Sequence, residues 1–134
     1  MTKNKSYIAL DIGEKRIGVA AGDSQIKIAV PLDTIEVDGN ELRQIAEYAV
    51  RDQIEAFVVG YPRNQSGEPT AQTAYVEEFS KNLTDIAPVI FQDESLTSVL
   101  ATEQLQRSGR VYSKGDVDAG AAALILQDYL ETLG

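Results

Sequence analysis

An acidic residue, Asp11, interrupts the first apolar run of the sequence. Residues 7–12 are otherwise apolar without alternation, which is typical of a central strand covered on both faces. A carboxylate in such a strand costs several kcal/mol unless it is paired, hydrogen-bonded or bound to a cation. We therefore expect Asp11 to have a compensating partner, which in the simplest case is the set of amides in the following turn.

Glycines bracket the turn that follows Asp11. Gly13 and Gly18 stand on either side of Glu14, Lys15 and Arg16. Residues 7–22 therefore predict a hairpin in which glycine allows an unusual backbone angle or the close approach of a ligand.

A second candidate acid is Glu94, at the end of a strand predicted at residues 88–92. Strand alternation puts Asp93 and Glu94 on opposite faces, but it leaves open which face is which. In the simplest alternative, Asp93 caps the next helix together with Ser95 or Thr97.

The third candidate acid lies at the start of the last helix, which we expect from about residue 116 to 133. Asp116 and Asp118 point about 200° apart at about 3.6 residues per turn. Asp118 shares its stripe with Ala122, Ile125, Leu126 and Tyr129. We therefore expect Asp118 to face inward, although an aspartate at a helix start also suits the helix dipole without any catalytic role.

Carboxylates on two strand ends and one helix start can converge to bind Mg²⁺ or Mn²⁺ through oxygen ligands. Two such ions suit phosphodiester hydrolysis, because one activates a water while the other stabilises the leaving oxygen. The sequence contains neither histidine nor cysteine. This excludes Ser-His and Cys-His catalysis, histidine or thiolate zinc sites and a disulfide framework.

The formal charge of −9 from 12 basic and 21 acidic residues argues against non-specific electrostatic binding of duplex nucleic acid. A local basic rim around an acidic centre remains compatible with it. No apolar run approaches the roughly 20 residues that span a bilayer, and the N-terminus lacks the apolar segment of a signal peptide. The sequence thus predicts a soluble, cytoplasmic protein without membrane association.

The element order predicts one α/β domain over residues 1–134. A three-strand antiparallel meander (7–12, 16–22 and 26–30, with a possible continuation at 34–37) precedes two parallel strands (56–60 and 88–92). Helices are expected at about 42–50, 76–86, 94–107 and 116–133. The result is a five-stranded mixed sheet flanked by helices.

With these residues placed, the sequence resembles the bacterial YqgF family of ribosomal RNA precursor nucleases or Holliday junction resolvases. The matching blocks run in order over nearly the whole chain: Leu10-Asp11-Ile12-Gly13, Lys15-Arg16-Ile17-Gly18-Val19-Ala20, Val59-Gly60-Tyr61-Pro62 with Asn64 and Gly67, Asp93-Glu94 with Leu96-Thr97, and Val117-Asp118 before Ala121-Ala122 and Ile125-Leu126-Gln127-Asp128-Tyr129-Leu130. The resemblance implies a ribonuclease H-like fold.

The resemblance also implies roles for individual residues. Asp11, Glu94 and Asp118 would be the catalytic, metal-binding acids. The remaining roles belong to the rim, where the substrate contacts would be Lys15, Arg16, Arg63 and Asn64, and where Thr97 would help order the turn at Glu94.

The sequence departs from the family pattern at three positions. Ser95 replaces a common arginine, Arg63 stands where an apolar residue is frequent, and Ala119-Gly120 replaces a frequent basic residue. The substitutions at Ser95 and Ala119-Gly120 remove cations near the expected centre, so they would weaken the affinity for a large polyanion.

The leading hypothesis is a metal-dependent endonuclease acting on RNA, with 5′-end processing of the pre-16S ribosomal RNA as the family's implication. Ribosomal particles are then possible partners, and the protein is expected to be a monomer or weak homodimer. The alternatives are a Holliday junction resolvase, which needs paired centres and a basic surface, and a non-catalytic RNA-binding module. ATP-dependent phosphotransfer is disfavoured, because Glu14 stands where actin-like kinases place a hydroxyl residue and there is no room for their second domain.

Overall fold

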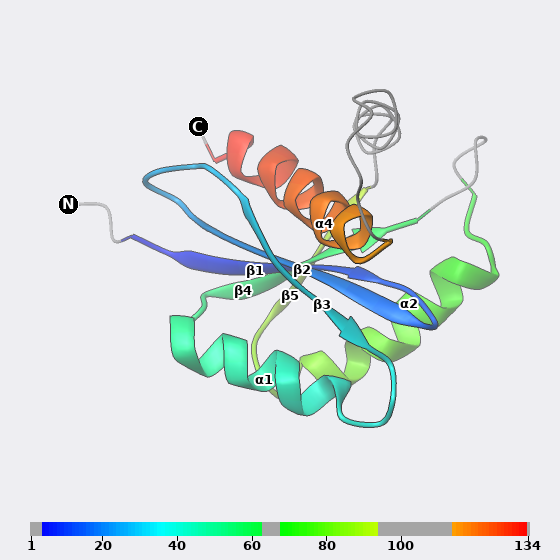
Figure 1. The fold of residues 1–134 in the computed structure, drawn as a ribbon. Helices are drawn as coiled ribbons and strands as arrows, with labels where there is room; N and C mark the ends of the chain where they lie inside the picture. The colour runs from blue at the N-terminus through cyan, green and yellow to red at the C-terminus, as the bar shows by residue number, and fades with distance from the viewer. Residues whose placement is uncertain (1–3, 63–67, 94–113, 134) are drawn as a thin grey trace.

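The computed structural model describes residues 4–62, 68–93 and 114–133. These residues form a five-stranded sheet in the order β3-β2-β1-β4-β5 (Figure 1). The antiparallel meander consists of β1 (Ser6–Ile12), β2 (Arg16–Asp23) and β3 (Val30–Glu36). The parallel part adds β4 (Ala56–Tyr61) beside β1 and β5 (Val89–Asp93) beside β4. The predicted mixed sheet is confirmed.

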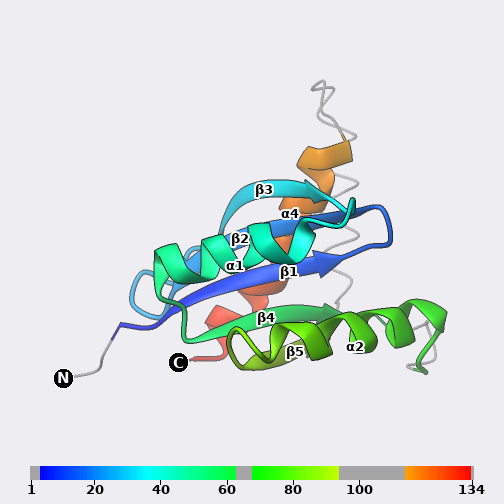
Figure 2. The ribbon, with the colours of Figure 1, turned by 90° about the horizontal axis from the view of Figure 1, so that it is seen from below.

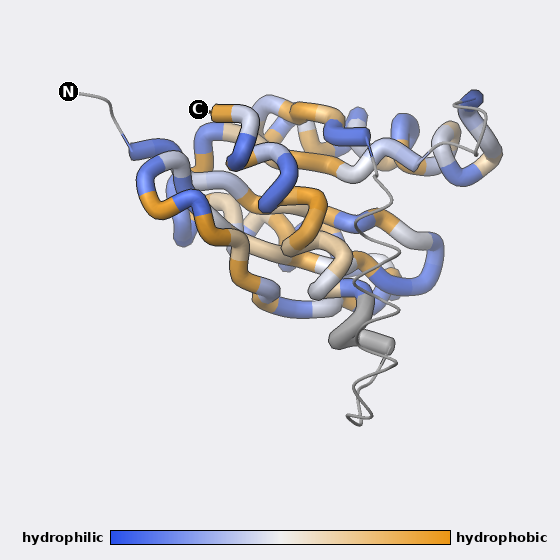
Figure 3. Tube along the Cα trace, turned by 90° about the horizontal axis from the view of Figure 1, so that it is seen from above, coloured by the Kyte–Doolittle hydropathy of each residue, from blue (hydrophilic) through white to orange (hydrophobic). Residues whose placement is uncertain are grey.

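Three helices cover the two faces of this sheet. Helices α1 (Glu41–Asp52) and α2 (Ala71–Leu83) lie on one face, and α4 (Lys114–Glu131) lies on the other (Figures 1 and 2). The helix expected at residues 94–107 lies outside the described residues. Hydrophobic and hydrophilic residues alternate along much of the trace, as expected of elements with one buried side (Figure 3).

Strand β1 has both faces buried, which explains its continuous apolar sequence. Ile8, Leu10 and Ile12 belong to the core beneath α1 and α2, whereas Tyr7 and Ala9 belong to the core beneath α4. Burial raises the pKa of Tyr7 to about 12, and a hydrogen bond with Tyr129 of α4 adds to the effect. The alternation assigns Asp11 to the same face as Tyr7 and Ala9.

Helix α4 lies close to β2 because the residues of β2 beneath it are small. A Cβ atom built on Gly18 would lie 1.9 Å from the backbone oxygen of Asp118, and one on Gly22 would lie 2.9 Å from Leu130 Cδ1. Ala20, between them, is fully buried in the core beneath α4. Glycine at residue 18 thus lets the beginning of α4 rest directly on the sheet.

The third strand differs from its prediction, because β3 begins at Val30 rather than at residue 26. Residues 26–29 form instead the end of the connection after β2, which is held to α4 by Gln127. The Gln127 side chain accepts a hydrogen bond from Ala29 N and donates one to Lys27 O, both at 2.9 Å. Pro31 lies within β3, where an edge position tolerates the missing N–H.

Candidate active site

Asp11 lies one residue before the end of β1 and is partly buried. Its partner across the antiparallel pair is Gly18 of β2. Cα atoms of directly opposed antiparallel residues lie about 4.5–5.5 Å apart. Asp11 therefore lies beside the point where α4 meets the sheet.

Asp118 lies at that same point. Its backbone oxygen lies over Gly18, as the clash of a Cβ at that position shows, and its side chain is 27% exposed. The first strand and the last helix thus bring Asp11 and Asp118 to one face of the sheet, on either side of Gly18. Neither Gly13 nor Gly18 has a positive φ, so the expected unusual backbone angle is absent at both glycines. Gly18 admits the backbone of α4.

Arg16 contacts the second of these acids. Its Nε atom donates a hydrogen bond to Asp118 Oδ2 at 2.9 Å, and the Arg16 side chain is 32% exposed. Because the pair is partly shielded from water, its attraction is screened less than that of a fully exposed pair. The structure therefore gives Arg16, expected at the substrate rim, a direct contact with a candidate catalytic acid.

Lys15 lies in the turn before β2 and is exposed. Its carbonyl accepts a hydrogen bond from Val37 N, which fixes the turn against the end of β3. The turn is also closed by a hydrogen bond from Gly13 N to Arg16 O. Lys15 thus projects from an ordered turn next to Arg16.

The remaining predicted site residues, Arg63, Asn64, Glu94 and Thr97, lie outside the described residues. Within the described ranges, no group of three acidic side chains is placed to hold a metal ion. The open question about Asp93 is answered, because it lines a pocket together with residues of α2. Asp93 therefore lies on the face opposite Asp11.

The two acids that the structure places together suit a hard divalent cation. Carboxylate oxygens are the ligands that Mg²⁺ and Mn²⁺ prefer, and the sequence offers no imidazole or thiolate ligand for a softer metal. Arg16 already neutralises part of the negative charge at Asp118, which shows that this position favours a positive partner.

The sheet order, with helices on both faces, defines the class of the protein, which is a ribonuclease H-like fold. Solved structures that share this fold include the following two. RuvC from Thermus thermophilus, in complex with a Holliday junction substrate, gives a TM-score of 0.59 at 15% identity and covers 96% of this chain and 94% of that chain. Fowlpox virus resolvase, in complex with Holliday junction DNA, gives a TM-score of 0.53 at 13% identity, with 96% and 98% covered.

Residues 5–132 match the family described as RuvX, Holliday junction resolvase, and the chain belongs to this family. Relatives named "Putative pre-16S rRNA nuclease" include one from Dechloromonas aromatica, 40% identical over 95% of this chain and 91% of its own length. Another, from Chloroflexus aurantiacus, is 39% identical over 92% and 85%. The chain is accordingly a phosphodiester hydrolase. Among the described helices, none is long and apolar enough to cross a membrane.

Proposed function

We propose that this protein is a metal-dependent endonuclease that cleaves RNA, with the 5′ end of the pre-16S ribosomal RNA as its target within ribosomal particles. The observation that carries the proposal is the meeting of Asp11 and Asp118 beside Gly18. The choice of substrate is supported by the names of the relatives from Dechloromonas aromatica and Chloroflexus aurantiacus.

In this proposal Asp11, Asp118 and Glu94 hold Mg²⁺ or Mn²⁺ at the α4 face, and a two-ion site is expected. Glu94 lies outside the described residues, and it is included because the family resemblance implies it. When bound, such ions supply an activated water and stabilise the leaving oxygen.

The basic residues beside the acids orient the substrate. Arg16, held by Asp118, presents its remaining N–H groups next to the acids, and a guanidinium binds phosphate oxygens in a fork geometry. Lys15 is exposed in the adjoining turn, and in this proposal it contacts a neighbouring phosphate. Arg63, Asn64 and Thr97 complete the proposed rim.

The test is cleavage of end-labelled RNAs, including the 5′ leader of the pre-16S RNA, with Mg²⁺ and with Mn²⁺. We expect the wild type to cleave the leader. The variants Asp11→Asn, Glu94→Gln and Asp118→Asn should fold. Each should lose at least about 100-fold in turnover, because each removes a charged metal ligand. Unchanged cleavage by Asp11→Asn would contradict the assignment. Metal-independent binding without cleavage would indicate an RNA-binding module.

Resolution of Holliday junctions is the second candidate, favoured by the description of the family. It requires two centres in a dimer and a surface that attracts duplex DNA, which the formal charge of −9 disfavours. The mass in solution and the cleavage of a four-way junction, measured beside the RNA panel, separate the two. We expect a monomer or weak dimer that prefers RNA.

A further inference from the structure

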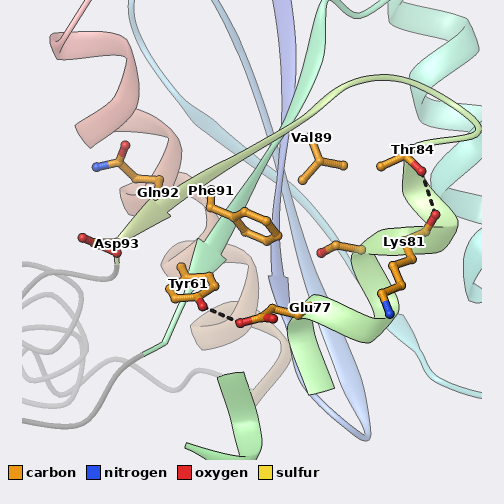
Figure 4. A pocket seen from close by; sticks show the side chains of 9 residues that line it. Tyr61, Glu77, Lys81, Thr84, Val89, Phe91, Gln92 and Asp93 are labelled. Atoms are coloured by element: carbon orange, nitrogen blue, oxygen red, sulfur yellow. Dashed lines mark hydrogen bonds between the residues drawn. The ribbon is translucent and has the colours of Figure 1, made fainter. Parts of the chain in front are cut away.

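A pocket of about 830 Å³ opens between α2 and β5, on the face of the sheet opposite Asp11. Its size falls in the range of small-ligand sites, about 300–1,000 Å³. Because β5 is an edge strand in the described sheet, the pocket lies at the border of the sheet. Figure 4 shows side chains from β4, α2 and β5 around it.

Two aromatic rings form one wall of this pocket. The rings of Tyr61 and Phe91 meet edge to face, with centroids 5.1 Å apart and planes at 66° (Figure 4). Phe91 remains 45% exposed although it is a large apolar side chain. An exposed aromatic ring that packs against a second ring offers a surface on which a planar ring can stack.

A buried hydroxyl group lines the same pocket. Ser80 is 3% exposed, and within the described residues its Oγ atom has no hydrogen-bond partner. Buried polar side chains are nearly always hydrogen-bonded, so an unpartnered one calls for an explanation. The Oγ atom itself has less than 1 Å² of exposed surface, so a ligand in the pocket would bond to it only after a neighbouring side chain moves.

The charges around the pocket select against a phosphate. Glu77 and Asp93 bring two carboxylates, and Lys81 brings one ammonium group, which already pairs with Glu78 at 3.0 Å. Glu77 also accepts a hydrogen bond from the Tyr61 hydroxyl. This lining favours an uncharged ring that carries an exocyclic amino group, since carboxylates accept hydrogen bonds from the amino groups of bases.

We propose that the pocket binds one base of a single-stranded RNA, stacked on Phe91, with preference for the amino-bearing bases adenine, cytosine and guanine over uracil. This inference rests on the proposed function, because it makes the pocket a subsite for the same substrate. The pocket includes Asp93 at the C-terminal end of β5, and Asp11 lies at the same end of the parallel strand β1.

The sequence contains no tryptophan, so the fluorescence of a single introduced tryptophan reports on its position alone. In a Phe91→Trp variant, the single indole occupies the stacking position, and its fluorescence should be quenched when a base stacks on it. We expect oligo(A) and oligo(C) to quench it more strongly than oligo(U), in a buffer with EDTA so that no cleavage occurs. A Val50→Trp variant is the control, because Val50 is 74% exposed on α1, away from the pocket.

Binding of labelled oligo(A) by the Phe91→Ala and Ser80→Ala variants completes the test. We expect Phe91→Ala to weaken binding by about tenfold or more, as the loss of one stacked base does elsewhere, and Val50→Ala to leave it unchanged. Equal quenching of both tryptophan variants, or unchanged binding by Phe91→Ala and Ser80→Ala, would overturn the proposal. So would binding of free AMP as tight as that of the oligonucleotide. Because these measurements report binding without metal, they remain decisive if cleavage itself is not found.

Discussion

At the scale of single residues, Arg16 is the neighbour that shapes the candidate site. Its Nε atom donates a hydrogen bond to Asp118 Oδ2 at 2.9 Å. A divalent cation that binds this oxygen must therefore compete with Arg16. Ion pairs at a protein surface contribute up to about 1 kcal/mol. In the proposed function, Arg16 contacts a phosphate of the substrate once a cation has taken its place at Asp118.

Substitution of Arg16 by alanine should strengthen the binding of Mn²⁺ by about three- to fivefold, because the competing cation is removed. The same change should weaken the binding of RNA. Lys15→Ala is the matched control, since it removes an equal charge from the adjoining exposed turn. Calorimetric titration with Mn²⁺ measures both variants. An equal gain in the two would show that net charge, rather than the contact with Asp118, is responsible.

At the scale of elements, the site depends on how closely α4 approaches β2. Gly18→Ala places a Cβ 1.9 Å from the backbone oxygen of Asp118, and backbone atoms cannot move aside as a flexible side chain can. We expect α4 to shift, with a loss of at least about 2 kcal/mol in the free energy of unfolding, as for other overpacked interiors. Denaturant unfolding measures this loss, and cleavage should fall with it.

Gly120→Ala is the matched control within α4. A Cβ at residue 120 meets no atom within 4 Å, so this change should stabilise the helix by about 0.5–1 kcal/mol. If both glycine variants were equally stable, the close contact between α4 and the sheet would not hold in solution.

The sequence predicted the elements better than their contacts. Continuous apolar residues identified β1 as a central strand, and the helical stripe indicated the inward face at Asp118. The role of Gly18 was missed, because it depends on a helix about 100 residues later in the chain. The strand predicted to begin at residue 26 was also wrong. Ile26 and Ile28 alternate with polar or small residues as in a strand, but the position of residues 26–29 depends on Gln127 of α4. Long-range contacts of this kind leave no local pattern.

At the scale of the whole molecule, the first strand and the last helix jointly build the site on one face. The other face, covered by α1 and α2, carries the pocket beside Phe91. In the proposed function, contact with RNA depends on local features rather than on general electrostatic attraction, because the formal charge is −9. The proposed catalytic site and the proposed base subsite therefore lie on opposite faces of the sheet.

The measurement that tests the central claim most directly is the binding of Mn²⁺, followed by the electron paramagnetic resonance signal of the free ion. The wild type and Asp38→Asn, an exposed position in the turn before α1, should bind alike. Asp11→Asn and Asp118→Asn should each lose at least about tenfold in affinity, because each gives up a charged oxygen ligand. Binding by these two variants that equals that of the wild type would contradict a cation site at the junction of β1, β2 and α4.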